Sequence, residues 1–231
     1  MYLNHILHSP SFGLLLTLLC YIAFVWLKGK WKWRFIHPLI YASGAIMLII
    51  WLSGLDGEAY KIGGDWISWG LGPATVALAV PLYKHAPVIR SKLGAVLAGI
   101  TVGSVLSAAA TAYLLAAAGA SADIVYSAIA KSSSAPFSIE IASRLGGIPE
   151  LAAAFSVLTG LFGSLAGPAF LRLCGIKSDI PIGAAVGTGS HGIGTARLMA
   201  DSELQGSVSG FSMAFAGIVT SIMMIPIYLF Q

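Results

Sequence analysis

The feature that most limits this fold is a series of apolar blocks long enough to cross a membrane. Eight blocks follow one another along the 231 residues, separated only by short polar connections. A helix crosses the hydrocarbon core of a bilayer with about 20 mostly apolar residues. Charged residues make up 10% of the chain, whereas the surface of a soluble domain requires about 25%. The sequence therefore predicts an all-α polytopic membrane protein, with one domain over residues 1–231.

The blocks are of two kinds. Five are long enough to span as ordinary helices, at 10–27, 37–54, 92–118, 150–174 and 207–230. Three are shorter and interrupted by Gly, Pro, Ser and Thr, at 66–83, 123–141 and 181–199. Broken backbone at membrane depth is tolerated only inside protein or beside a water-filled cavity. We therefore expect about seven to eight membrane segments, including broken or re-entrant helices that mark a transport site.

Two further patterns bear on the packing of the helices. The pairs Gly99-x-x-x-Gly103 and Gly163-x-x-x-Gly167 are typical of helices that approach one another closely. The segments that begin at Gly72-Pro73 and at Ser134-Ala135-Pro136 are each followed by a basic loop and then a long helix. This repeated order of segments predicts an internal repeat, because transporter folds often arise from repeats.

The loop charges predict an orientation. Basic residues occur in loops 28–36 and 84–92, while the loop between these two carries Asp56, Glu58 and Asp65 against Lys61. Basic loops face the cytoplasm, so the N-terminus is expected outside. The stretch before residue 28 lacks a basic leader and a cleavage site, and we interpret it as a membrane helix rather than a signal peptide.

Other classes of function find little support. The net charge of +4 comes from these short loops and not from a basic stripe, so nucleic-acid binding is not expected. Cys20 and Cys174 form no metal-ligand or disulfide pattern and are interpreted as apolar packing residues. Neither a metal nor a cofactor is predicted.

The run from Gly187 to Arg197 is the most unusual in the chain. Its first six residues fit G-x-G-x-x-G, but no strand precedes them and no acidic residue follows at the required distance, so a dinucleotide site is rejected. Ser190 and His191 lack an orienting carboxylate for nucleophilic catalysis, and no enzyme is predicted. A helix that begins near Gly192 would present its N-terminal amides to an anion.

The polar side chains of this run have competing interpretations. His191 is either a ligand or proton-coupling group, as intramembrane ionisable residues usually are, or a packed residue bonded to a neighbouring helix. Arg197 either binds a carboxylate through two hydrogen bonds or extends to the membrane interface. A second polar run places Ser132, Ser133 and Ser134 before a proline. In that run Glu140 either contributes to the site or pairs with Arg144 at i, i+4.

Several of these motifs together resemble the LrgB/CidB family. They are Gly72-Pro73-Ala74-Thr75 to Tyr83, Lys131-Ser132 to Glu140, Leu145-Gly146-Gly147-Ile148-Pro149 and Gly189-Ser190-His191-Gly192-Ile193-Gly194-Thr195-Ala196-Arg197. The resemblance covers essentially the whole chain in the right order. The chain departs from it at Ser133-Ser134-Ala135, where relatives usually carry Val-Thr-Thr, and at Gly189, where they usually carry Ala.

The resemblance implies two kinds of function in a bacterial cytoplasmic membrane. Bacterial members were named as holin- or antiholin-like regulators of murein hydrolase export and autolysis, acting beside a small LrgA/CidA-type membrane protein. A plastid relative exchanges glycolate and glycerate, and some bacterial pairs are linked to pyruvate uptake. The polar broken segments favour a secondary transporter of small monocarboxylates, because a simple pore needs none of them.

We therefore predict a carrier, with the autolysis regulator as the alternative. A homodimer is expected, and coupling to protons or sodium is open at this stage. The residues predicted to bind the carboxylate are Ser132, Ser133, Ser134, Glu140, Thr188, Ser190, His191, Gly192, Gly194, Thr195 and Arg197.

Overall fold

The computed structural model describes residues 9–31, 38–55 and 57–229. The chain divides into two compact units, residues 1–77 and residues 78–231. Lys32 and Arg34, on which part of the predicted orientation depends, lie outside the described residues.

The described residues of the first unit form the helices α2 (Pro10–Trp31), α3 (Pro38–Ser53), α4 (Gly57–Trp69) and α5 (Leu71–Ala77). Helix α2 packs closely on α4, because a Cβ atom at Gly13 would lie 2.5 Å from the carbonyl oxygen of Tyr60. The hydroxyls of Thr17 and Tyr60 are hydrogen-bonded across this contact at 2.8 Å. The predicted break in block 66–83 is confirmed at Gly70, between α4 and α5.

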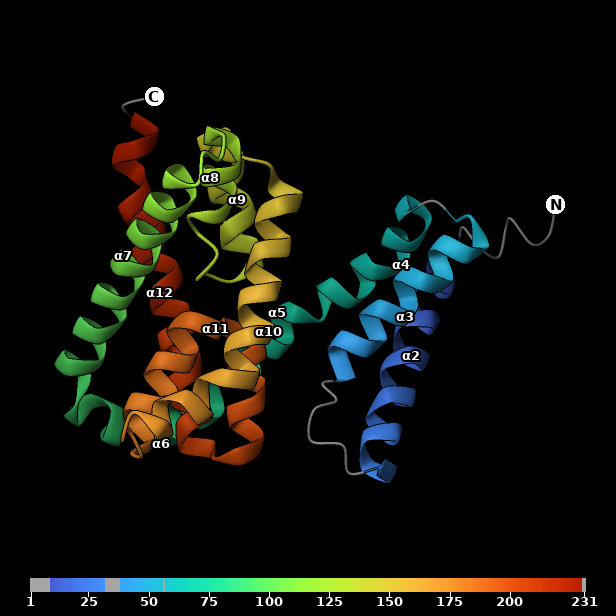
Figure 1. The fold of residues 1–231 in the computed structure, drawn as a ribbon. Helices are drawn as coiled ribbons and strands as arrows, with labels where there is room; N and C mark the ends of the chain where they lie inside the picture. The colour runs from blue at the N-terminus through green and yellow to red at the C-terminus, as the bar shows by residue number, and fades with distance from the viewer. Residues whose placement is uncertain (1–8, 32–37, 56, 230–231) are drawn as a thin grey trace. The chain divides into compact units, whose positions relative to one another are not determined.

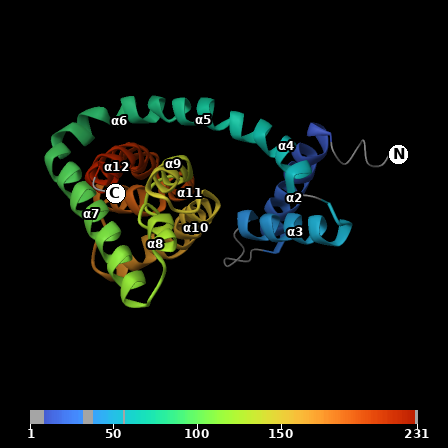
Figure 2. The same ribbon diagram turned by 90° about the horizontal axis from the view of Figure 1, so that it is seen from above.

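The described residues of the second unit form seven further helices (Figure 1). They are α6 (Ala79–Ser91), α7 (Leu93–Ala117), α8 (Ala122–Ala128), α9 (Ala135–Leu145), α10 (Pro149–Leu173), α11 (Asp179–Asp201) and α12 (Glu203–Leu229). Helices α10 and α12 both pack against α11, and Figure 2 shows this group from above with α7 along its side.

Among the described residues, four helices are long and apolar enough to cross a membrane: Ser11–Lys30 within α2, together with α7, α10 and α12. These four confirm the predicted spans in blocks 10–27, 92–118, 150–174 and 207–230. Helix α3, in block 37–54, has 16 residues and is shorter than a usual span. The structure supports an all-helical membrane protein, while the predicted number of about seven to eight segments stays a prediction.

Block 123–141 folds into a hairpin, here called the first hairpin, which consists of α8, residues 129–134 and α9. Helix α8 ends before the three serines, and Pro136 stands in the first turn of α9, where a missing N–H costs nothing. Gly146 ends α9 in the left-handed conformation, at φ 76°, which glycine adopts without strain. The backbone N–H of Ile148 then donates to Ser127 Oγ at 2.7 Å, so the chain that leaves α9 returns to the last turn of α8.

Block 181–199 forms a second hairpin within α11, with arms at residues 179–190 and 192–201. His191 interrupts the helix with φ 38° and ψ −129°, which confirms the predicted break near Gly192. A Cβ atom at Gly194 would lie 2.7 Å from Val186 Cγ1 and 3.3 Å from the carbonyl oxygen of Val186. In a straight helix, residues eight apart are separated by about 12 Å along the axis. The second arm therefore runs back beside the first.

The two hairpins enter the second unit from opposite ends. The first follows the end of α7 and leads into the start of α10, while the second follows the end of α10 and leads into α12 (Figure 1). The order of a 25-residue helix followed by a broken segment thus occurs at α7 and again at α10. The repeat predicted from Gly72-Pro73 and Ser134-Ala135-Pro136 pairs other segments and is not confirmed.

The glycine pairs behave differently from each other. A Cβ atom at Gly163 would overlap Ser190 Oγ, and one at Gly167 would touch Val186 Cγ2 at 3.6 Å, so close packing of α10 on the second hairpin is confirmed. On α7 a Cβ atom at Gly103 would touch Thr188 Cγ2 of the second hairpin at 3.7 Å, whereas Gly99 makes no such contact. A Cβ atom at Gly99 would meet nothing within 4 Å, because this face of α7 borders a cavity instead of a helix.

Candidate functional site

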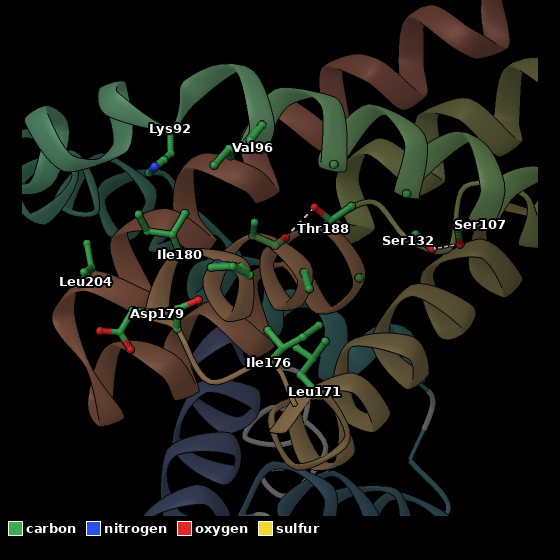
Figure 3. A pocket seen from close by; sticks show the side chains of 18 residues that line it. Lys92, Val96, Ser107, Ser132, Leu171, Ile176, Asp179, Ile180, Thr188 and Leu204 are labelled. Atoms are coloured by element: carbon green, nitrogen blue, oxygen red, sulfur yellow. Dashed lines mark hydrogen bonds between the residues drawn. The ribbon is translucent and has the colours of Figure 1, made fainter. Parts of the chain in front are cut away.

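A cavity of about 820 Å³ lies in the second unit, between α7 and the first arm of the second hairpin (Figure 3). Small residues at every turn of α7 open this space, and apolar atoms cover most of its wall. The described residues that line it are Lys92, Ala95, Val96, Gly99, Gly103, Ser107, Ser132, Leu171, Ile176, Ser178, Asp179, Ile180, Pro181, Ala184, Ala185, Thr188, Gly189 and Leu204.

One end of the cavity carries hydroxyl groups. Ser107 of α7 and Ser132 at the tip of the first hairpin are joined by a hydrogen bond of 2.5 Å between their Oγ atoms. Whichever serine donates in that bond, the other keeps its own proton free for an acceptor. Thr188 lies nearby in Figure 3, and its Oγ1 donates to the carbonyl oxygen of Ala184 at 2.8 Å. This end therefore offers neutral donors suited to a small anion.

The other end carries charge. Figure 3 shows Lys92 and Asp179 at the side of the cavity opposite Ser107 and Ser132. Lys92 stands at the start of α7 and Asp179 in the first turn of α11. The cavity therefore leads from two charged side chains to a group of hydroxyls.

The two hairpin tips meet beside α10. His191 is buried, with 4% of its surface exposed, and its Nε2 lies 3.4 Å from the carbonyl oxygen of Lys131, to which the Nε2–H tautomer donates. Ser156 Oγ of α10 donates to the carbonyl oxygen of Ser133 at 2.8 Å. A Cβ atom at Gly160, one turn later on α10, would lie 2.9 Å from His191 Cε1. One face of α10 thus supports both tips.

The backbone of His191 is strained. A φ of 38° with a ψ of −129° is a conformation that glycine adopts far more readily than any residue with a side chain. Residues held in such regions cost about 1–3 kcal/mol each and cluster at functional sites. The contacts to Lys131 and Gly160 favour the interpretation of His191 as a packed residue bonded to a neighbouring element, and His191 is not among the described residues that line the cavity.

Of the predicted binding residues, Ser132 and Thr188 line the cavity. The other hydroxyls of the two runs hold the hairpins together. Ser133 Oγ donates to the carbonyl oxygen of Ala130 at 2.8 Å, and Thr195 Oγ1 donates to the carbonyl oxygen of His191 at 2.7 Å. Ser190, Gly192, Gly194 and Ser134 also lie outside the described lining, because they form the tip of one hairpin, its second arm or the N-cap of α9.

Glu140 does not reach the cavity. Its Oε1 pairs with Arg144 Nε at 2.5 Å, and both side chains are more than 60% exposed. The spacing of four residues in α9 brings them together. The alternative of a pair with Arg144 is therefore confirmed, and a contact between Glu140 and a bound carboxylate stays a prediction.

Arg197 is also placed away from the cavity lining. Its Nη1 donates to the carbonyl oxygen of Ser164 on α10 at 2.6 Å. In a helix that carbonyl would accept the N–H of residue 168, but residue 168 is Pro168 and has no N–H. Arg197 thus satisfies a carbonyl that the proline leaves free. This bond occupies Nη1 of Arg197, and a contact between this side chain and a carboxylate stays a prediction.

This bond predicts an interaction between Arg197 and Pro168. Arg197→Ala should lower the unfolding free energy by about 1–3 kcal/mol, because a buried carbonyl loses its donor. In a Pro168→Ala background the loss should fall by at least about half, because the new backbone N–H binds Ser164. Thermal unfolding of the four proteins in detergent measures this difference. An equal loss in both backgrounds would show that the bond contributes nothing.

Several residues of the site were not predicted from the sequence. Ser107, Lys92 and Asp179 line the cavity, as do Gly99 and Gly103. A usable signal existed for Ser107, since Ser104, Ser107 and Thr111 recur at helical spacing within an apolar span. Lys92 ends the basic loop 84–92, and no sequence pattern marked Asp179. Among the described residues no group of three or more His, Cys, Asp or Glu side chains is arranged to hold a metal ion.

Comparison with known proteins places this architecture in a family. The model of the LrgB-like family matches residues 17–230. The uncharacterized protein YxaC of Bacillus subtilis is 34% identical over 208 residues, which is 90% of both chains. The Holin-like protein CidB of Staphylococcus aureus is 30% identical over 214 residues, which is 93% of both chains. No solved structure matches this chain.

Proposed function

Since the chain belongs to the LrgB-like family, we propose that it is a secondary transporter that moves small monocarboxylates across a bacterial cytoplasmic membrane. The observation that carries this proposal is the cavity, which ends in hydroxyl donors where one hairpin tip lies beside the other hairpin. Carriers place their substrate sites near the middle of the membrane, at broken helices whose free backbone groups and hydroxyls bind the ligand. Ser107 and Ser132 are the proposed carboxylate donors, while Thr188, whose hydroxyl proton is bonded to Ala184, borders the same end of the cavity.

Basic residues at one end of the second unit support an orientation of the cavity in the membrane. Lys92 begins α7, and Arg172 and Lys177 lie near the end of α10, so basic residues gather at the end of the second unit where the cavity carries charge. Basic segments face the cytoplasm. In this proposal the cavity opens inward, and the two hairpin tips close it from the other side.

A second candidate function is a holin-like or antiholin-like regulator of autolysis with no substrate of its own. The observation that favours it is the similarity, over 93% of this chain, to relatives from Staphylococcus that are named Holin-like protein CidB. A partner of the LrgA/CidA type and a homodimer belong to this proposal as well as to the first. The two functions make opposite predictions about a blocked cavity.

Gly99→Phe should abolish transport without unfolding the protein. The ring would enter the cavity between its charged and hydroxyl ends, and a Cβ atom at Gly99 meets nothing within 4 Å. Uptake of labelled pyruvate, glycolate and glycerate into proteoliposomes should fall at least about tenfold, which corresponds to about 1.4 kcal/mol in transition-state free energy. Helix stability should not suffer, because glycine is the weaker helix former.

Gly94→Phe is the matched control. Gly94 lies on the same helix, a Cβ atom there also meets nothing within 4 Å, and it is not among the described lining residues. Its uptake should equal that of the parent protein. Absence of saturable uptake in the parent, together with dye leakage that rises with protein density, would favour the holin-like function instead.

A further inference from the structure

The charged end of the cavity contains a carboxylate held by a buried amide. Of the described residues that line the cavity, two carry charge, Lys92 and Asp179. Gln205, in the first turns of α12, donates from Nε2 to Asp179 Oδ1 at 2.6 Å. Gln205 is 6% exposed, and its Oε1 is buried with no hydrogen-bond partner among the described residues.

An unpaired buried amide oxygen is costly. Leaving a buried acceptor without a donor forfeits a hydrogen bond that water would otherwise have provided, so such groups call for an explanation. A carboxylate only accepts hydrogen bonds, whereas a protonated carboxyl group also donates one. A glutamine amide serves both forms, because a rotation of 180° exchanges its N–H₂ donor for its carbonyl acceptor. Gln205 is therefore equipped to bind Asp179 with or without a proton.

We propose that Asp179 and Gln205 form the proton-binding site of this carrier, a role that rests on the proposed transport function. With the cavity open, a proton from water binds the Asp179 carboxylate, and the resulting O–H donates to Gln205 Oε1 after the amide has turned. A monocarboxylate anion binds at the hydroxyl end. Proton and anion then cross together without net charge, and Asp179 returns its proton to water on the other side.

Asp179 is the one carboxylate among the described residues that line the cavity. From α12, Glu203 pairs with Lys84 Nζ at 2.8 Å and has His85 Nε2 3.8 Å away, so its charge is compensated by α6. From α7, Lys92 lines the cavity, where it is suited to attract the anion. Lys177 precedes α11 and Asp201 ends it. His191 and Arg197, the groups first considered for charge coupling, are bonded to backbone carbonyls elsewhere.

The test compares exchange with net transport of pyruvate in proteoliposomes. In the parent protein an inward proton gradient should drive pyruvate accumulation, and a pH dye trapped in the lumen should report acidification. Asp179→Asn mimics the permanently protonated form. It should therefore retain pyruvate–pyruvate exchange, which requires no release of the proton, and should lose gradient-driven accumulation at least about tenfold. Gln205→Met should likewise slow accumulation more than exchange.

Asp201→Asn is the matched control, since this exposed aspartate ends the same hairpin without lining the cavity. It should behave as the parent does. The proposal is overturned if Asp179→Asn accumulates pyruvate under the gradient as the parent does. It is also overturned if that variant, folded by thermal unfolding, loses exchange together with accumulation. Absence of both processes from the parent would instead refute the transport function on which the proposal rests.

Discussion

Replacing Gly187 by alanine should leave little folded protein, whereas the same change at Gly189, two residues later, should leave stability intact. A Cβ atom at Gly187 would overlap the carbonyl oxygen of Ser209 and would lie 2.7 Å from its Cα and 2.8 Å from its carbonyl carbon. All three atoms belong to the backbone of α12, so no side chain can rotate away. The second hairpin would have to separate from α12.

The expected cost at Gly187 is about 3 kcal/mol or more, at the upper end of overpacking in a close-packed interior. At Gly189 a Cβ atom meets nothing within 4 Å, and alanine favours a helix by up to about 1 kcal/mol over glycine. The yield of monodisperse protein and the midpoint of thermal unfolding in detergent measure both effects. Equal stability of the two variants would mean that α11 and α12 are not in backbone contact at this point.

Removal of the His191 ring should nearly abolish transport while leaving the protein folded. In His191→Gly the strained φ becomes an ordinary one for the residue present, so the midpoint of unfolding should not fall. The bond from the second hairpin to the Lys131 carbonyl is lost, and with it the link between the two tips. Uptake of pyruvate should fall at least about tenfold, or about 1.4 kcal/mol.

The facing helix provides an independent test of the same contact. In Gly160→Ala the new Cβ atom would stand 2.9 Å from His191 Cε1 and 3.3 Å from Nδ1, which displaces the ring from Lys131. Uptake should fall as it does in His191→Gly. Gly167→Ala on the same helix, where the nearest atom is Val186 Cγ2 at 3.6 Å, is the matched control and should transport normally.

The pH profile of the remaining uptake separates positioning from proton coupling. If His191 only positions the hairpin tips, the profiles of His191→Gly and Gly160→Ala should keep the shape of the parent profile at lower amplitude. A profile that becomes flat in His191→Gly alone would assign the coupling proton to the imidazole and would contradict the role inferred for Asp179.

Much of the scaffold was accessible from residue patterns alone. Length and hydropathy predict spans because a bilayer imposes one thickness on every helix that crosses it, and four helices confirm this. Breaks were also predictable, since Pro136 and the glycines around His191 cannot continue a helix without cost. The pairing of Glu140 with Arg144 needed only the local geometry of one helix.

The positions of polar side chains relative to the cavity were not accessible in this way. Ser132 and Ser133 are neighbours in the sequence, yet Ser132 lines the cavity while Ser133 bonds within its hairpin. The sequence pattern predicts that Arg197 binds an anion. In the structure Arg197 donates to the Ser164 carbonyl, which Pro168 of α10 leaves without a backbone donor. Such assignments depend on contacts between residues far apart in the chain, which local patterns do not report.

The sequence by itself determined that this chain is a helical membrane protein of the LrgB-like family, and where its helices are interrupted. Both follow from local rules, since hydrocarbon selects apolar runs and prolines or glycines end helices. Only the tertiary structure decided that two broken segments fold back as opposed hairpins, with Asp179 on the cavity wall and His191 away from it. The direction taken after a break depends on long-range packing against α10 and α12, and that packing also selects which polar groups border the cavity.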